Sequence, residues 1–423
     1  MISIFASVAL LLYLRAMRAS YRRLGSYLII DPRVVFSSSV MAVYVLPMLM
    51  LGQDVFTAFG VWPGVPYVCF AVLLLLFCSG VEPVRFTIAK GPSRRSRRVL
   101  SYIRLMPILF ISVLAYLYWA SAAGGLARLV STVHGHVGEV TSGIVVQIAD
   151  WMFLALFPLL VLIQRDMARL PLAGLAVLVV VVFSALEILI FGNRGTTIRI
   201  ALGVIGFFVW RQGGLNACSI ILTCIAGGTV YILPHVRLAL FIGADYSIFE
   251  LLDRIGADIF LGSSASGGNE LIVATGIASL ARDGAFASEI GFRYLITPFL
   301  MIPTELFEFL IGVKPHYQTA GTVVNDLISH QLRWEPGHGS AVTIIGDVFS
   351  SFGHLSWIAF LVIGAGIGAS SMRSRPLHAE DILKVCIIDV AIVYFVTQDF
   401  KQFFWYLSLG MLFFFLVTYR KSS

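Results

Sequence analysis

The chain has 423 residues, of which 58% are hydrophobic and 13% charged, and its mean hydropathy is +0.90. Soluble domains carry roughly 25% charged residues, so the composition excludes a soluble globular protein; it also excludes disordered, collagen-like and disulfide-scaffold proteins. The net charge is +7. In a membrane protein we interpret this excess of basic residues as a mark of the cytoplasmic side rather than as a sign of nucleic-acid binding. We expect an all-α, polytopic integral membrane protein.

Apolar runs along the chain predict about eleven transmembrane helices, since each crossing needs about 20 mostly apolar residues. The predicted spans lie near residues 2–14, 34–52, 62–82, 105–123, 143–163, 171–190, 195–210, 215–233, 343–369, 384–398 and 402–418. The first run is followed by Arg15 and Arg18 rather than by a small-residue cleavage site. We therefore expect it to remain as an anchor rather than to act as a cleaved signal peptide.

Basic residues gather in six segments, which hold 20 of the 30 Lys and Arg residues. The segments are residues 15–33, 85–104, 165–169, 211, 373–384 and 420–421. All six fall on one side of the membrane if the N-terminus is outside and the C-terminus is cytoplasmic, as an odd number of spans requires. The sequence therefore predicts this orientation.

The chain divides into three parts on this plan. Residues 1–233 hold transmembrane helices 1–8, residues 234–341 form one large loop outside, and residues 342–423 hold helices 9–11. Apolar residues recur at helical spacing in the loop, which predicts short amphipathic helices lying on the outer membrane surface. We expect the chemistry of the protein at this face.

Asn193-Arg194-Gly195 stands at the outer end of two spans, one turn after the helix that carries Glu187. The Arg194 guanidinium can hold phosphate with two donors, and Gly195 leaves room for a ligand to approach the backbone. The alternative is an interfacial arginine that pairs with Glu187. We regard Arg194 as a candidate phosphate-binding residue.

The large loop supplies further cations that could bind an anionic substrate. These are Arg237, Arg254, Arg293, Lys314 and Arg333. Surface salt bridges are the alternative for each of them, since Asp253, Asp258 and Glu289 are available as partners.

A dense polar segment precedes the ninth span, from Arg333 to Ser340, and Gly346-Asp347 follows it. His338 stands between two glycines, and its ordinary pKa near 6.5 suits proton abstraction at neutral pH. We take His338 as the leading general base, with Glu335 and Asp347 as alternatives. A turn histidine without catalytic role is the other interpretation.

Several motifs are absent from the sequence. It has no phosphate-binding P-loop, no His-Glu-x-x-His zinc site, no Gly-x-Ser-x-Gly elbow and no metal-ligand spacing among its five cysteines. We therefore expect no metal and no cofactor. If a site exists, its chemistry should rest on arginine.

These features together resemble a known family, the bacterial O-antigen (oligosaccharide repeat unit) polymerases called Wzy. The resemblance rests on the spans, the late loop, Asn193-Arg194-Gly195, the Pro298 to Pro303 stretch with Lys314-Pro315, and Gly346-Asp347 with Phe352-Gly353. It implies a glycosyltransferase of the GT-C-like class in the bacterial inner membrane. By this resemblance the enzyme polymerises undecaprenyl-pyrophosphate-linked repeat units on the periplasmic face.

The resemblance also assigns roles and partners. Arg194 and loop arginines would hold the pyrophosphate, and His338 or a nearby acid would activate the acceptor hydroxyl. The lipid-linked oligosaccharide would be both donor and acceptor, with membrane lipids and a chain-length regulator protein as further partners. Three alternatives stay open: an O-antigen ligase, a lipid-linked oligosaccharide flippase or other transporter, and a non-catalytic assembly scaffold.

Overall fold

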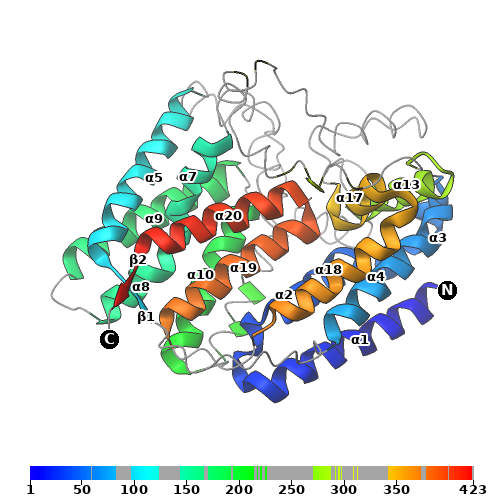
Figure 1. The fold of residues 1–423 in the computed structure, drawn as a ribbon, viewed down its shortest axis with the longest axis horizontal. Helices are drawn as coiled ribbons and strands as arrows, with labels where there is room; N and C mark the ends of the chain where they lie inside the picture. Colours follow the sequence, from blue (N-terminus) through cyan, green and yellow to red (C-terminus); the bar gives the residue numbers. More distant parts are fainter. Residues whose placement is uncertain are drawn as a thin grey trace, which may run out of the picture.

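Figure 1 shows a computed structural model built from α-helices packed side by side. The all-α class expected from the composition is confirmed for the part of the chain that the structure describes. The described residues are 1–58, 60–81, 97–122, 143–165, 170–191, 194–213, 270–286, 342–372, 378–398 and 400–421, with isolated residues between 217 and 225 and between 291 and 312.

Most helices of the first half follow the predicted apolar runs, but α1 (Ile2–Leu24) continues ten residues beyond the predicted end at residue 14. The elements of this half are α1, η1 (Gly25–Ile30), α2 (Pro32–Val40), a π-helical turn η2 (Met41–Val45), α3 (Leu46–Ala58), η3 (Trp62–Gly64), α4 (Val65–Gly80), β1 (Arg97–Leu100), α5 (Tyr102–Ala122), α7 (Gly143–Leu154), α8 (Leu156–Arg165), α9 (Leu170–Phe191) and α10 (Arg194–Gln212).

The second half begins with one helix from the predicted loop and continues with the C-terminal helices. These elements are α13 (Glu270–Arg282), α17 (Thr343–Phe352), η8 (Gly353–Leu355), α18 (Ser356–Ser370), α19 (Ala379–Thr397), α20 (Phe400–Val417) and β2 (Thr418–Lys421). β1 pairs with β2 in antiparallel register, Arg97 opposite Lys421.

Prolines account for two irregular points in the helices. Pro47 follows the π-turn between α2 and α3; a proline ring cannot fit against the carbonyl of the preceding turn, and a widened turn relieves the clash. Pro158 lies just after the break at Ala155, where the helix pair bends by 42°. The single span predicted over 143–163 is thus two helices, α7 and α8.

Six described helices are long and apolar enough to cross a membrane, and the bent pair of α7 and α8 makes up to seven. This agrees with a membrane protein. Helices α9, α10 and α19 coincide with three more predicted spans but are not among the six; α10 and α19 each carry several charged residues. The predicted total of eleven remains a prediction, and residues 215–233 fall mostly outside the described part.

One end of the bundle, here named the basic end, joins several predicted basic segments. Arg23 lies 3.8 Å from Asp31, which accepts the backbone N–H of Met372 at 3.0 Å. Arg165 forms an ion pair with Glu380 at 3.2 Å. Arg104 and the paired strands β1 and β2 lie beside the C-terminus, at the lower left of Figure 1.

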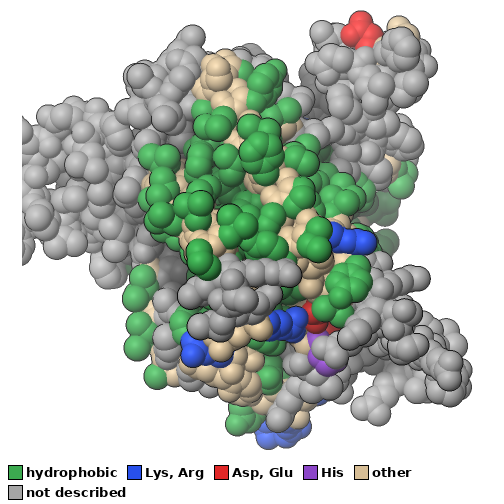
Figure 2. Space-filling view, turned by 90° about the vertical axis from the view of Figure 1, so that its left-hand side faces the viewer, with side chains coloured by type: hydrophobic (Ala, Val, Ile, Leu, Met, Phe, Trp, Pro, Cys, Tyr) green, Lys and Arg blue, Asp and Glu red, His purple; other side chains and the backbone are tan. Residues whose placement is uncertain are grey.

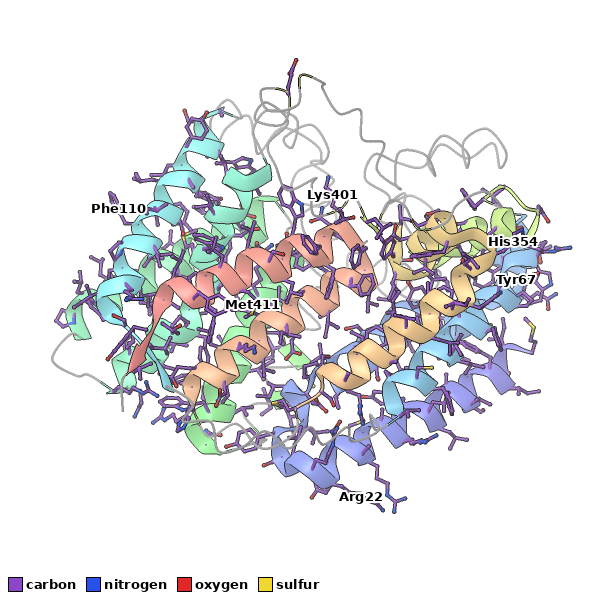
Figure 3. All side chains as sticks on the ribbon, viewed as in Figure 1. Arg22, Tyr67, Phe110, His354, Lys401 and Met411 are labelled. Atoms are coloured by element: carbon purple, nitrogen blue, oxygen red, sulfur yellow. The ribbon has the colours of Figure 1, made fainter. Side chains whose placement is uncertain are left out.

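The opposite end, here named the loop end, holds the first residues of η3, α10, α17 and α20 and the last residues of α5 and α19. Figure 3 labels Arg22 near the basic end and Lys401 on the opposite side. Which end faces the cytoplasm remains the prediction of the charge distribution.

The outer face over α5 and α9 is broadly apolar. Figure 2 shows hydrophobic side chains across this face, with Lys and Arg gathered towards its lower edge. Ile103, Phe110 and Leu114 on α5 and Leu175 and Leu178 on α9 are all exposed. A contiguous apolar surface of this kind is typical of a surface covered by lipid.

Two hydrophobic clusters form the interior. One is built by α1–α4, α13, α17 and α18, and the other by α5, α7–α10 and α20. α19 belongs to both, with Ile382, Cys386 and Ile387 in the second cluster and Ile392 and Phe395 in the first. In Figure 1, α19 and α20 lie between the two groups of helices.

Helix α13 belongs to the predicted outer loop, yet it packs within the first cluster. Leu271, Ala274 and Ile277 are fully buried, and α13 contacts α4, η3 and α17. The amphipathic segments predicted around 246–252 and 290–309 lie outside the described residues, apart from isolated positions. Part of the loop therefore contributes to the helical core.

Glycines on α18 allow it to pack closely against α4. A Cβ atom at Gly364 would lie 2.7 Å from the Cys78 Cβ atom and 3.2 Å from the Leu75 carbonyl oxygen. A Cβ atom at Gly366, on the same helix, would have no described neighbour within 4 Å. A small residue at a helix contact, such as Gly364, lets the backbones of two membrane helices approach closely.

We expect Gly364→Ala to lower the free energy of unfolding by about 1–3 kcal/mol, because the added methyl group overpacks the α4–α18 contact. Gly366→Ala is the matched control, and alanine is the better helix former, so it should leave stability unchanged or slightly raised. Thermal unfolding of both variants in the same detergent checks this. Equal effects of the two substitutions would contradict the packing assigned to Gly364.

Candidate functional site

The nine sequence-predicted site residues differ in how far the structure describes them. Asp347 is described completely, and Arg194 is described as the first residue of α10, without its side chain. The other seven lie outside the described residues: Glu335, His338, Arg237, Arg254, Arg293, Lys314 and Arg333. Their roles stay predictions.

Asp347 lies in α17 at the loop end, with its side chain 4% exposed. Its Oδ2 atom accepts a hydrogen bond from the Tyr294 hydroxyl at 2.7 Å and one from the Phe400 backbone N–H at 3.0 Å. Its Oδ1 atom accepts one from the Ser351 hydroxyl at 3.4 Å. The carboxylate thus joins α17, the start of α20 and a residue of the predicted outer loop.

Aromatic packing surrounds this carboxylate. The Tyr294 ring stacks on Phe400, with centroids 4.2 Å apart and planes at 17°, and meets Phe352 edge-on at 4.8 Å. Gly291 donates its N–H to the Ser351 carbonyl at 2.7 Å. Its φ of 78° and the Phe352 ring, 2.2 Å from where a Cβ atom would stand, require glycine. These contacts hold positions 291 and 294 against α17.

α17 begins with a strained residue. Thr343 has φ of 55°, in the left-handed region that β-branched residues rarely adopt, and its side chain is fully buried. Backbone strain of this kind concentrates at functional sites. In the sequence, Thr343 follows the leading candidate base His338 by five residues.

α10 and α19 run antiparallel, which places the start of α10 at the loop end as well. Arg199 contacts Tyr394, whereas the Cys386 thiol contacts the Leu202 carbonyl oxygen. Arg194 precedes Arg199 by five residues, about 7.5 Å along the helix. The backbone of Arg194 therefore lies towards the end of α19, where Phe400 binds Asp347.

A second buried polar group lies one to two turns inside the loop end, and we call it the Arg199 cluster. It consists of Asp150 in α7, Glu187 in α9, Arg199 in α10, Tyr394 in α19 and Tyr406 in α20. The Arg199 Nη1 atom lies 2.8 Å from Asp150 Oδ1, and its Nη2 atom donates to the Tyr394 hydroxyl at 2.8 Å. Five helices thus meet at one guanidinium.

The tyrosines complete the cluster. The rings of Tyr394 and Tyr406 stack with centroids 3.7 Å apart, and the Arg199 guanidinium carbon lies 4.7 Å from the Tyr406 centroid. Glu187 is 4% exposed and interacts electrostatically with Arg199 and with Tyr116 of α5. The positive charge therefore has acidic and aromatic neighbours on several sides.

Arg199 was not among the candidate residues chosen from the sequence, and Glu187 was considered only as a partner for Arg194. One signal was available: Arg199 is a cation within a predicted span, and such a charge needs an anionic partner. Which acid would serve depended on the packing of α7 against α10.

The two groups differ in what they can do chemically. Asp347 already accepts three hydrogen bonds, so its described geometry suits holding α17, α20 and Tyr294 together more than removing a proton from a substrate. The Arg199 cluster has its cation paired inside the bundle. Within the part of the chain that the structure describes, no three His, Cys, Asp or Glu side chains are grouped to hold a metal ion.

Comparison with protein-family models, with curated proteins and with solved structures gave no match.

Proposed function

We propose that the protein is a membrane-embedded glycosyltransferase that polymerises undecaprenyl-pyrophosphate-linked oligosaccharide repeat units. The proposal rests on the sequence resemblance to the O-antigen polymerases. It places the reaction at the periplasmic face and makes the loop end the site of reaction. The chain-length regulator and the lipid-linked oligosaccharide remain proposed partners.

The observation that carries the proposal is the meeting of predicted site elements at the loop end. The first residue of α10 is Arg194, and α10 starts at the end of the bundle where Asp347 binds Phe400 and Tyr294. Tyr294 belongs to the segment 234–341, which also supplies the predicted arginines. Segments that are distant in the sequence therefore meet at the loop end of the bundle.

The chemistry needs few parts. The acceptor hydroxyl oxygen attacks the anomeric carbon of the donor sugar; the bond from that carbon to the phosphate oxygen breaks, and the lipid diphosphate leaves. A base takes the hydroxyl proton, for which His338 is the leading candidate. Arginine suits stabilisation of the departing diphosphate, because its guanidinium stays charged and binds phosphate with two donors. A direct displacement inverts the anomeric configuration.

The test is a polymerisation assay with purified protein and a lipid-diphosphate oligosaccharide of the host's repeat unit, in EDTA, with products resolved by size. Wild-type protein is expected to yield a ladder of multiples. Arg194→Ala should lower the rate by about 100-fold or more, as removal of a charge-stabilising group at a reacting centre does. His338→Ala should abolish the ladder.

Two exposed residues of the same types serve as matched controls. Arg211→Ala changes an exposed arginine at the other end of α10, and His354→Ala changes an exposed histidine beyond α17 (Figure 3). Both should retain the ladder. A ladder that survives in the Arg194 and His338 variants, or depends on a divalent metal, would contradict the mechanism; transfer to lipid A core instead would identify a ligase.

A transporter is the second candidate, and one observation favours it. Asp150, Glu187 and Arg199 are buried inside the helical body rather than at its end, as expected of groups along a transport pathway. Movement of a labelled lipid-linked oligosaccharide across a vesicle bilayer, without any ladder of products, would select this function over the polymerase.

A further inference from the structure

A buried acid in the middle of α19 takes no part in the candidate site. Asp389 is 0% exposed, and within the part of the chain that the structure describes neither of its carboxyl oxygens has a hydrogen-bond partner. It lies ten residues after Ala379 and eight before Thr397, so it is far from both helix ends. An ionisable group at such a depth is a functional candidate by default.

α2 contacts α19 alongside this acid and runs in the same direction. Asp31, just before α2, binds Met372 shortly before α19, and the Tyr44 hydroxyl beyond α2 donates to the Val396 carbonyl near the end of α19. Asp389 precedes Val396 by seven residues, and Ser37 precedes Tyr44 by seven. Seven residues are about two helical turns, so Ser37 and Asp389 lie at about the same height along the two parallel helices.

Ser37 is polar and buried in the same way. Its side chain is 0% exposed and, among the described residues, its hydroxyl oxygen has no hydrogen-bond partner. Buried polar side chains are nearly always paired, so two unpaired ones on contacting helices need an explanation. The adjacent side chain on α19, Cys386, is buried too and faces the Leu202 carbonyl of α10.

The charges nearest to Asp389 do not neutralise it. Asp31 acts on it electrostatically with the same sign of charge, and is itself held by Ser20 and Arg23. Arg33, one turn before Ser37, directs its Nη2 atom at the carbonyls of Val81 and Gly368, 3.4 Å away in each case.

Several charged side chains described on the other elements packed on α19 already have partners, and Arg211 at the end of α10 is exposed. The paired groups are Arg165 of α8 with Glu380, Arg199 of α10 with Asp150, Asp347 of α17 with Tyr294, and Lys401 of α20 over Trp405.

An ionised carboxylate without partner is expensive in an apolar interior, and the group becomes neutral by binding a proton. We propose that Asp389 forms a proton-binding site at the level of Ser37 between α2 and α19, occupied at neutral pH. The bound proton removes the charge of the carboxyl, and the Ser37 hydroxyl adds a second buried polar group at this level. The site is independent of the glycosyl-transfer proposal.

Infrared spectroscopy of the purified full-length protein at pH 7 tests this directly. The spectrum of wild type minus that of Asp389→Asn should contain a protonated-carboxyl C=O band, which shifts in D2O. Asp381→Asn, an exposed acid on the same helix, is the matched control and should leave this band intact. Asp389→Glu should move the band instead of removing it, which covers the case in which the asparagine variant does not fold.

Other outcomes overturn the proposal. Absence of the band in wild type, with an unchanged spectrum in both Asp389 variants, would mean that Asp389 is ionised. A rise in thermal stability on adding sodium chloride in place of choline chloride, lost in Asp389→Asn, would make Na⁺ the occupant rather than the proton. Stability that is independent of Na⁺, together with the band, supports the proton site.

Discussion

Arg199→Met is expected to lower the free energy of unfolding by about 3–5 kcal/mol, the cost of breaking a buried ion pair by removing one partner. Methionine fills much of the same volume, so the loss reports the charge rather than a cavity. The physical reason is that Asp150, 2.8 Å from Arg199 and itself buried, would be left without its cation. The Tyr394 hydroxyl would also lose its donor.

A double-mutant cycle with Asp150 isolates this effect. Asp150→Leu alone leaves Arg199 unpaired and should also destabilise strongly, whereas the double variant with Arg199→Met should recover much of the loss, because apolar pairs often replace buried ion pairs at little cost. Arg211→Met, an exposed arginine of the same helix, is the control and should cost less than about 0.5 kcal/mol.

Thermal unfolding in detergent, followed by circular dichroism, measures the stability of wild type and of all four variants. Simple additivity of the two single losses would show that Arg199 and Asp150 do not depend on each other, against the described geometry. A loss below about 1 kcal/mol for Arg199→Met would likewise show that the guanidinium is not buried among these helices.

Asp347→Ala is expected to cost about 2–4 kcal/mol, because the Tyr294 hydroxyl and the Phe400 N–H both lose their acceptor, and each unpaired donor costs about 1–3 kcal/mol. Asp347→Asn keeps one carbonyl oxygen in place and should cost less. Tyr294→Phe removes only the hydroxyl and should cost about 1 kcal/mol. Thermal unfolding curves of the three variants should show the largest loss of stability for Asp347→Ala.

The asparagine variant also separates two roles. If Asp347 positions α17 and α20, Asp347→Asn should retain measurable polymerisation, whereas His338→Ala should not. Complete loss of the ladder in a well-folded Asp347→Asn protein would instead make Asp347 the general base. Asp283→Asn, an exposed acid after α13, serves as control and should change neither stability nor product formation.

α19 connects the features to which these predictions refer. It carries Tyr394 of the Arg199 cluster, Asp389 of the proposed proton site and the turn that presents Phe400 to Asp347. Its two halves pack in different hydrophobic clusters. The middle of α19 is therefore connected, through this one helix, to the Arg199 cluster and to the contacts of Asp347.

Local pattern predicted most helix positions. Apolar runs marked α4, α5, α9 and α20 to within a few residues, because a span must be long and apolar whatever it packs against. The break between α17 and α18 at residues 353–355 was not predicted, since the sequence predicts one span over 343–369. Gly353 has φ of 47°, a backbone conformation that glycine adopts readily.

The candidate site could be predicted only in part. Arg194 and Asp347 were chosen from sequence, and the structure brings the start of α10 and the Asp347 carboxylate to one end of the bundle. The partners of Asp347 could not be foreseen, because Tyr294 is 53 residues before it and Phe400 is 53 residues after it. Contacts over such separations depend on how helices pack.

By itself the sequence determined the class of protein, the approximate bounds of its helices and the gathering of basic residues, since these follow from transfer of side chains between water and an apolar phase. Only the tertiary structure decided which charges meet. It paired Arg199 with Asp150, tied Asp347 to Tyr294 and Phe400, buried α13 beside α4 and, among the described residues, left the Asp389 carboxyl without a hydrogen-bond partner. The reason is physical: hydropathy acts residue by residue, whereas pairing of buried polar groups depends on the facing surfaces of separate helices.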